Sequence, residues 1–517
     1  MKKFLSMAAL ALVGAMTVSC SSDDNIIEQP QQQEVTKNNV VTLTTTVGFA
    51  DDGTTRALTA AGVKTFASGE TMAVIYNNGT STVKAVSHAL KVSDITDGGK
   101  KATFTFDLET PNKSGSVLYI YPAAMAGDTG VDMTKLKTQE GTFDALQSKY
   151  DLCTNFGAWD GDNLPSLTLE NLLAILAITL KNEAGTSDIT SSITGLTLSD
   201  GTKTYNVNRE AVAGPIYVAI FPTADATITV TATDGTTKNY TKTLTTTKTY
   251  EAGNGYPVSW KMTQVATDLS TLTAAHTAQN GDILTGTLGS NVKISIADGA
   301  SVTLKDVTIN GTNDEDYGWA GISCEGNATI ILSGTNIVKG FYEDYPGIQA
   351  AADKTLIING TGSLTASSYG FGAGIGGGRV LDCGNIEIQG GTVTATGSLM
   401  GAGIGSGYQG TCNDITISGG TVEATGGYRA AGIGSGNGAS CGIITISSGT
   451  VTATGGSHAA GIGSGANGSS CGDITITSGV THVTATKAEE APNSIGAGEG
   501  STCGTVTIED ESKVTQN

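Results

Sequence analysis

The chain has few of the residues and patterns on which several functional classes depend. It holds four histidines, which are scattered, and no CxxC pair, so a zinc site is not expected. Its 28 Lys and Arg are outnumbered by 48 Asp and Glu and form no patch with interleaved aromatics, which argues against a nucleic-acid partner. The mean hydropathy is near zero, which is typical of a soluble protein and not of a membrane-embedded one.

Long segments with a helical period are also missing, and short alternating segments take their place. Ile415 and Ile417 alternate with polar residues, as do Val422 and Ala424 after a pair of glycines. This period of two, broken by the glycines, indicates strand, turn and strand. The chain is therefore expected to be all-β, and its 517 residues leave room for three domains.

The strongest pattern is a short repeat in the second half of the chain. Five cysteines recur at steps of 29, 29, 30 and 32 residues, each inside a copy of one glycine-rich phrase: Cys383, Cys412, Cys441, Cys471 and Cys503. The isoleucine of a Gly-Ile step extends this register to seven copies: Ile322, Ile348, Ile375, Ile404, Ile433, Ile462 and Ile495. We predict a parallel β-helix of about seven coils over residues 263–517, with capping strands at 284–287 and 302–309.

The stacked cysteines are expected to be buried thiols that fill the interior as small apolar groups. In-register stacking places neighbouring Cα atoms within reach of a disulfide, but parallel side chains hold the Cβ atoms further apart than a bridge prefers. Disulfides between neighbouring coils stay the alternative.

The first 39 residues indicate export and tethering. An apolar run from Phe4 to Met16 suits a secretory signal and is too short to span a bilayer. Its end resembles a lipoprotein cleavage site that leaves Cys20 as the lipidated first residue, and residues 21–25 resemble an acidic tag for surface export. We expect a lipoprotein signal peptide at 1–20, a disordered tether at 21–39, and anchoring in outer-membrane lipid through acylated Cys20. An ordinary cleaved signal peptide is the alternative.

Residues 40–262 carry strand patterns separated by turn signals such as Asn77-Asn78-Gly79. The expected strands are 41–47, 72–76, 102–108, 117–121, 167–180, 193–198, 216–222, 227–232 and 256–262. The apolar part at 172–180 suits either a buried strand or a short core helix. Since no long helical pattern intervenes, we predict antiparallel β-sandwiches over 40–165 and 166–262.

Several phrases in this part resemble the fimbrillin family of pilins and surface lipoproteins of Gram-negative anaerobes. They are Val47-Gly48-Phe49, Thr55-Arg56-Ala57, Gly69-Glu70, Leu118-Tyr119-Ile120-Tyr121-Pro122, Leu169-Glu170-Asn171-Leu172-Leu173-Ala174 and Ile220-Phe221-Pro222. The resemblance implies tandem β-sandwiches and, in polymerising members, cleavage after an arginine, here Arg56, so that another fimbrial subunit's strand fills the groove. Residues 263–517 depart from the pilin pattern, which favours a tip-like or non-polymerising protein.

Acidic and aromatic residues share the positions just before the repeated isoleucines. If the coils are in register, these positions form one stripe along the rod, where rings can stack on sugars and carboxylates can hold Ca²⁺. We predict glycan binding by Tyr317, Trp319, Tyr342, Tyr345, Tyr369, Phe371 and Tyr428, and a calcium site of Asp314, Asp316, Glu343 and Asp344. The alternative is that the rings shield a loop corner and the acids are solvated surface.

Residues 268–517 also resemble Gly-Ile-Gly-rich β-helix domains described as polysaccharide-binding, through their Leu-Thr-Gly, Ala-Gly-Ile-Gly and Ile-Thr-Ile-Ser-Gly-Gly-Thr-Val phrases. This resemblance implies calcium-assisted affinity for acidic glycans without cleavage. A lyase would need a strong base beside the calcium. The rod has two arginines, Arg379 and Arg429, and Arg379 is expected on a different edge from the acids because it follows its isoleucine. We therefore expect no enzyme.

Two functions fit these expectations. The first is a cell-surface adhesin or fimbrial tip-like component of a Gram-negative bacterium, whose rod engages polysaccharide or host glycans. The second is a structural stalk or pilus component whose rod is a spacer. A polysaccharide lyase is the less supported alternative.

Overall fold

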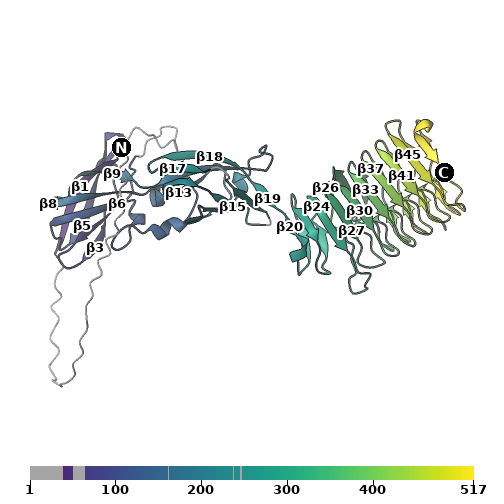
Figure 1. The fold of residues 1–517 in the computed structure, drawn as a ribbon, viewed down its shortest axis with the longest axis horizontal. Coiled ribbons are helices and arrows are strands. Elements are labelled where there is room, and N and C mark those ends of the chain that lie inside the picture. Colours follow the sequence, from purple (N-terminus) through teal and green to yellow (C-terminus); the bar gives the residue numbers. More distant parts are fainter. Residues whose placement is uncertain (1–38, 50–64, 161, 237, 245–246) are drawn as a thin grey trace, which may run out of the picture.

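The computed structural model describes residues 39–49, 65–160, 162–236, 238–244 and 247–517. Sheets follow one another along the chain, first in two β-sandwich regions and then in a long β-helix (Figure 1). The all-β prediction is confirmed. The expected signal peptide, Cys20, Arg56 and all of the tether except residue 39 lie outside the described residues. No helix among the described residues has the length and apolar character needed to cross a bilayer.

The first sandwich is one eight-stranded sheet folded around its own core of buried aromatic and aliphatic side chains. Its strand order is β3-β2-β6-β8-β9-β1-β5-β4. The strands are β1 (Val40–Phe49), β2 (Ala73–Asn77), β3 (Thr82–Val86), β4 (Ile95–Thr96), β5 (Lys101–Glu109), β6 (Ser114–Tyr121), β8 (Cys153–Asp160) and β9 (Leu167–Asn171). Strand β1 alternates buried and exposed side chains, as its sequence pattern predicts.

The second sandwich packs a three-stranded sheet against a six-stranded one, with a separate two-stranded ribbon. The three-stranded sheet holds β13 (Ile216–Ile220), β10 (Ala174–Lys181) and β18 (Gly255–Lys261). The six-stranded sheet holds β19 (Thr263–Val265), β16 (Asn239–Thr243), β15 (Thr229–Thr233), β11 (Gly195–Ser199), β12 (Thr204–Asn208) and β7 (Thr138–Gln139), and the ribbon holds β14 (Thr223–Ala226) and β17 (Lys248–Tyr250). The ambiguous apolar segment is therefore a strand, since β10 covers most of it.

The β-sandwich prediction is confirmed, but the sandwiches are not antiparallel throughout. Strands β1 and β9, β10 and β18, and β12 and β7 pair in parallel. The partners in each parallel pair are far apart in the sequence, and a parallel pair cannot be joined by a tight hairpin. Sequence alternation shows that a segment is a strand but carries no information on the direction of its neighbour.

The two sandwiches share part of one core. Short helical turns join them: Ala123–Met125, Met133–Lys137, α1 (Phe143–Ala145) and Leu146–Tyr150. Met125, Leu136 and Leu146 from these turns are buried in the core of the second sandwich. The buried side chain of Gln139 in β7 donates to Ala219 O at 2.7 Å and accepts from Ala219 N at 2.9 Å. The predicted boundaries between domains stay a prediction.

Residues from 267 onward form a parallel β-helix of three sheets. The seventeen-stranded sheet holds β20 (Thr267–Asp268), β22 (Ile283–Thr287), β24 (Ala300–Asn310), β26 (Ala328–Ser333), β27 (Thr335–Lys339), β29 (Thr355–Gly360), β30 (Ser363–Ser367), β32 (Asn385–Ile388), β33 (Thr392–Thr396), β36 (Ile415–Ile417), β37 (Thr421–Thr425), β40 (Ile444–Ile446), β41 (Thr450–Thr454), β44 (Ile474–Ile476), β45 (His482–Thr486), β48 (Val506–Ile508) and β49 (Val514–Gln516). Each coil contributes to several sheets, so the rod lengthens by one layer per repeat (Figure 1).

The seven repeated isoleucines open seven of the nine strands of the nine-stranded sheet. These strands are β21 (His276–Ala278), β23 (Ile294–Ile296), β25 (Ile322–Cys324), β28 (Ile348–Gln349), β31 (Ile375–Gly376), β34 (Ile404–Gly405), β38 (Ile433–Gly434), β42 (Ile462–Gly463) and β46 (Ile495–Gly496). From Ile322 to Ile495 each isoleucine pairs with the next in register. Their side chains are 0 to 6% exposed, so they form one continuous file in the core.

The cysteine ladder makes the small third sheet of the rod. Its strands are β35 (Thr411–Cys412), β39 (Ser440–Cys441), β43 (Ser470–Cys471) and β47 (Thr502–Cys503), and an isolated bridge extends it to Cys383. Each cysteine pairs with the next one in register. The five ladder thiols are unbridged, and four of them are buried, as expected.

The predicted capping strands are ordinary rungs of the rod. Strands β22 and β24 pair in parallel with each other, and β24 pairs in parallel with β26. The rod therefore begins before Ile322, and its nine-stranded sheet is two strands longer than the seven expected coils. The first coil is closed by Leu269, in the helical turn Leu269–Thr271, whose buried side chain joins the rod core.

The glycine that follows the repeated isoleucine, from Ile375 onward, allows close backbone approach. Gly376, Gly405, Gly434 and Gly463 have φ values between 134° and 135°, where L side chains are strained. A Cβ on Gly434 would lie 1.8 Å from Gly463 O. The spacing of the coils at this corner therefore depends on the absence of a side chain.

We predict that Gly434→Ala lowers the free energy of unfolding of the rod by at least about 3 kcal/mol, because the new methyl group meets backbone that has no room to move. The matched control is Gly468→Ala, where φ is 77° but nothing lies within 4 Å of the added Cβ. Its cost is about 1 kcal/mol of backbone strain. Urea denaturation of both variants measures the difference, and equal losses would contradict the close approach.

Candidate functional site

The loops that enter the nine-stranded sheet stack on one another and form what we call the loop edge: residues 311–321, 340–347, 368–374, 397–403, 426–432 and 455–461. Backbone hydrogen bonds join successive loops, from Phe341 N to Trp319 O at 3.2 Å and from Phe371 N to Glu343 O at 2.6 Å. The same holds further along, from Gly427 N to Gly401 O at 3.0 Å. All predicted glycan and calcium residues lie on this loop edge.

Tyr317 and Trp319 form an aromatic corner with Phe341. The ring centroids lie 5.4 Å apart for Tyr317 and Trp319, and 5.7 Å apart for Trp319 and Phe341. Both predicted residues are half-buried and pack against the rod core. Trp319 Nε1 is buried and has no hydrogen-bond partner among the described residues. Much of the surface of these two rings therefore packs against the corner, which leaves less of it for a ligand.

The Arg379 cluster, which we define as Asp344, Phe371, Arg379 and Tyr408, lies in the next coils. The Arg379 guanidinium stands 4.9 Å from the centre of the Phe371 ring, and its Nη1 is 3.5 Å from Asp344 Oδ1. The rings of Phe371 and Tyr408 are 5.6 Å apart. The expectation that Arg379 and the acids occupy different edges is wrong, because Arg379 N donates to Asp344 O at 2.7 Å and this bond holds the two loops together.

Val380 is an exposed apolar residue in a strained backbone conformation beside this cluster. Its side chain is 62% exposed and its φ is 53°. The equivalent positions in later coils are Gln409, Gly438, Asn467 and Gly500, whose φ values lie between 54° and 63°. Left-handed backbone is costly for a β-branched residue, and such strain gathers at functional positions. Val380 thus places an apolar group in solvent where the backbone favours glycine.

Acidic side chains surround Tyr342 on the loop edge. Partial burial, and then the charges of Glu343, Asp344 and Glu315, raise the pKa of its hydroxyl. Asp314 accepts a hydrogen bond from Asp316 N at 3.1 Å, so it closes a local turn. Across the described residues, no group of three or more His, Cys, Asp or Glu is arranged to hold a metal ion. The calcium site stays a prediction.

The other predicted rings differ in how much of their surface is free. Tyr345 is half-buried and lies against Gly318, where an added Cβ would be 3.4 Å from its hydroxyl. Tyr369 donates to Gly311 O at 2.6 Å, and Lys339 Nζ stands 3.6 Å from its ring centre. Tyr428 is 53% exposed, with its ring 6.5 Å from that of His458. The predicted rings therefore do not form one uniform stripe: Phe371 belongs to the Arg379 cluster, Tyr317 and Trp319 cover the aromatic corner, and Tyr428 is exposed further along the rod.

The sequence predicts no role for Tyr408 or Val380, and the predicted edge for Arg379 is the wrong one. The sequence does hold a signal for two of them, since Arg379 and Tyr408 each follow their marker isoleucine by four residues. The prediction of the stripe rests on the offset before the isoleucine alone. Residues after the isoleucine hydrogen-bond to the preceding coil, from Arg379 N to Asp344 O and from Tyr408 N to Phe371 O, and these bonds bring the two offsets to one edge.

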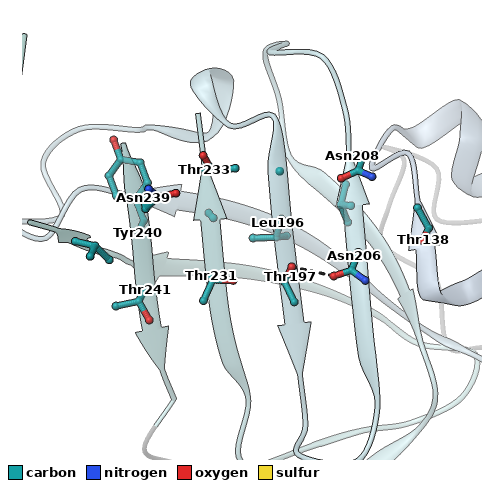
Figure 2. A pocket seen from close by; sticks show the side chains of 14 residues that line it. Thr138, Leu196, Thr197, Asn206, Asn208, Thr231, Thr233, Asn239, Tyr240 and Thr241 are labelled. Atoms are coloured by element: carbon teal, nitrogen blue, oxygen red, sulfur yellow. Dashed lines mark hydrogen bonds between the residues drawn. The ribbon is translucent and has the colours of Figure 1, made fainter. Parts of the chain in front are cut away.

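Apart from the loop edge, a hollow of about 450 Å³ lies on the outward face of the six-stranded sheet (Figure 2). A row of polar residues runs straight across it in register: Thr263, Thr241, Thr231, Thr197, Asn206 and Thr138. Thr197 donates to Asn206 Oδ1 at 2.9 Å. None of its described lining residues is charged, and its one ring, Tyr240, is 8% exposed. It therefore offers fewer groups that could orient a ligand than the Arg379 cluster does.

Comparison with known proteins supports the rod. Four segments, 356–379, 386–408, 415–437 and 444–466, match the family model for the beta helix repeat. The parallel β-helix prediction is confirmed by this match and by the strand pairing. No curated protein matches the chain.

Two solved structures are similar to parts of the chain. One is a fimbrial assembly protein from Parabacteroides distasonis, with 12% identity and a TM-score of 0.25, covering 43% of this chain and 90% of that one. The other is a proposed cell adhesion protein from Bacteroides uniformis, with 11% identity and a TM-score of 0.24, covering 43% of this chain and 97% of that one. Scores of this size do not by themselves establish a shared fold or function.

We predict that Trp319→Ala lowers the free energy of unfolding by about 3 kcal/mol, because the indole covers the core of an early coil. Tyr428→Ala, which removes an exposed ring of the same edge, should change it by no more than about 0.5 kcal/mol. Chemical denaturation followed by circular dichroism measures both. A Trp319 variant as stable as the Tyr428 variant would show that the ring covers nothing.

Proposed function

We propose that the chain is a lipid-anchored cell-surface adhesin or fimbrial tip-like protein that binds glycans, without catalysis, through the loop edge of its β-helix. The observation that carries this proposal is the Arg379 cluster. It brings a cation, a carboxylate and two rings together beside an exposed valine, in a conformation held by backbone hydrogen bonds between coils.

The cluster contributes little to the stability of the fold. An exposed cation–π contact contributes about 0.5–1 kcal/mol and a surface ion pair about 0–1 kcal/mol. The Arg379 and Asp344 side chains are 45% and 30% exposed, so both terms are screened by solvent. Strain at Val380 opposes them with about 1–3 kcal/mol. A set of groups that adds so little to folding is available for a ligand.

A sugar ring suits this arrangement chemically. Its vicinal hydroxyls can donate to the Asp344 carboxylate and accept from the Arg379 guanidinium, while one apolar face rests on Val380 or on a free ring edge. Tyr342, Tyr345 and Tyr428 would extend contact along the rod. The fixed spacing of the coils favours a chain of sugars over a single one.

Charge divides the ligands into two classes. The early loop edge holds five carboxylates, those of Asp314, Glu315, Asp316, Glu343 and Asp344, and Arg379 pairs with the last of them. A neutral glycan meets no repulsion there, whereas an acidic glycan needs a cation between the two sets of carboxylates. We therefore propose that acidic glycans bind with calcium, held by some of the predicted acids, and that neutral glycans bind without it.

The surface location and the tip-like role rest on the amino-terminal sequence and on the fimbrillin resemblance. Lipidation at Cys20 would anchor the chain, and the two sandwiches would hold the rod away from the membrane. Assembly with other fimbrial subunits through Arg56 cleavage belongs to the same proposal.

We predict that the purified mature chain binds members of a panel of neutral and acidic polysaccharides in isothermal titration calorimetry, with neutral binding unchanged by EDTA and acidic binding lost. Arg379→Ala and Phe371→Ala should each weaken binding at least tenfold, which corresponds to about 1.4 kcal/mol. The matched control, Thr394→Ala in β33 of the same coil, should bind as the parent does.

Three outcomes separate the alternatives. Binding that survives both variants would place the site elsewhere on the chain. No binding to any polysaccharide would favour the spacer role. Appearance of unsaturated sugar products from an acidic polysaccharide, measured by ultraviolet absorbance, would establish a lyase. Arg379, which lies beside Asp344, would then be the candidate base.

A further inference from the structure

The cysteine ladder ends in two thiols that touch. Cys471 and Cys503 pair in register between β43 and β47, and their sulfur atoms are 2.9 Å apart. In this pair the expectation that parallel side chains hold the groups too far apart does not apply, because both side chains lean toward each other across the gap between coils.

Cys503 is also the one member of the ladder that solvent can reach. Cys383, Cys412, Cys441 and Cys471 are 1 to 7% exposed, whereas Cys503 is half-buried. The reason is its position, since β47 is an edge strand of its four-stranded sheet in the structure. A dissolved oxidant therefore meets Cys503 first, and the nearest thiol to the resulting adduct is Cys471.

We propose that Cys471 and Cys503 are a modification site, at which a disulfide forms and fastens the last coil of the rod to the coil before it. The oxidant is a small-molecule disulfide. The Cys503 thiolate attacks one of its sulfur atoms and expels a thiolate, which leaves a mixed disulfide. The Cys471 thiolate then attacks the Cys503 sulfur and expels the second thiolate. Two protein thiols lose two protons and two electrons, and the oxidant becomes two thiols.

The reaction should be slow at neutral pH and faster in alkali. The hydrogen bond with Cys471, followed by burial and the charge of Asp473, raises the pKa of Cys503. The hydrogen bond with Cys441, and burial, raise the pKa of Cys471, although its bond with Cys503 acts in the opposite direction. Because the thiolate is the nucleophile, each unit of pH below these pKa values lowers the rate about tenfold.

The cross-link would stabilise the exposed end of the rod. It closes a loop between residues 32 apart, which reduces the freedom of the unfolded chain. Beyond it, Val506 is 39% exposed, so apolar burial alone holds the last coil weakly. The benefit falls on the last coil that the structure describes. This inference depends on export to an oxidising compartment and is independent of glycan binding.

The test uses the full mature chain, reduced and then incubated with oxidised glutathione at pH 8 and pH 9. Trypsin cleaves after Arg429, Lys487 and Lys513, so Cys441 and Cys471 share one peptide and Cys503 lies in the next. A Cys471–Cys503 bond joins the two peptides, whereas a Cys441–Cys471 bond stays within one. Mass spectrometry without reductant distinguishes them.

We expect the joined peptides in the parent and in the control Cys441→Ser, none in Cys471→Ser or Cys503→Ser, and faster formation at pH 9. The melting midpoint should rise by about 5 °C on oxidation and return with dithiothreitol. Glutathione left on Cys503, a bond within the Cys441 peptide, or free thiols after prolonged oxidation would each overturn the proposal.

Discussion

The in-register stacking of parallel coils is the constraint on which the rod depends. Each coil satisfies its strand hydrogen bonds on the next coil, so a residue's position in the repeat fixes its place on the rod. Ile404 pairs with Ile375, and Cys412 pairs with Cys383, because both ladders belong to coils that hydrogen-bond to each other in one register. Interior files of like side chains follow from this, as do the stacked loops that carry the candidate site.

The same constraint explains why the loops can hold a site at all. Loops on most folds vary in conformation independently, but here Phe371 and Arg379 bond to Glu343 and Asp344 of the preceding coil. A side chain on the loop edge is therefore positioned by its neighbours' backbone, which favours preorganised binding. Strain at Val380 can persist for the same reason, since the coils on either side determine its backbone.

Much of the fold could be predicted from sequence because two periods are visible in it. The repeat predicted which residues form the ladders, and the alternation of apolar residues predicted most strands, including β1 and β5. What failed was information that periodicity does not carry: the direction of β9 against β1, the insertion of β7 beside β12, and the fact that β22 and β24 are rungs and not a cap. The early rungs escaped because Ile294 lacks the Gly-Ile step that marks the later ones.

The candidate site was predicted less well, for a physical reason. Offset from the isoleucine places a residue in a loop, but it does not say whether its side chain covers the core, as Trp319 does, or faces solvent, as Tyr428 does. Nor does it reveal that Arg379 N bonds to Asp344 O of the preceding coil, which brings the two side chains together. Such contacts depend on the conformation of short loops, where one residue in left-handed backbone redirects all that follow.

A crystal structure of the mature chain soaked with an oligosaccharide tests the central claim most directly. The account predicts density for a sugar ring beside Val380, with hydroxyl groups on the Asp344 carboxylate and the Arg379 guanidinium, and the loops stacked as described. Sugar density confined to another surface, or loops whose side chains point in unrelated directions, would contradict it.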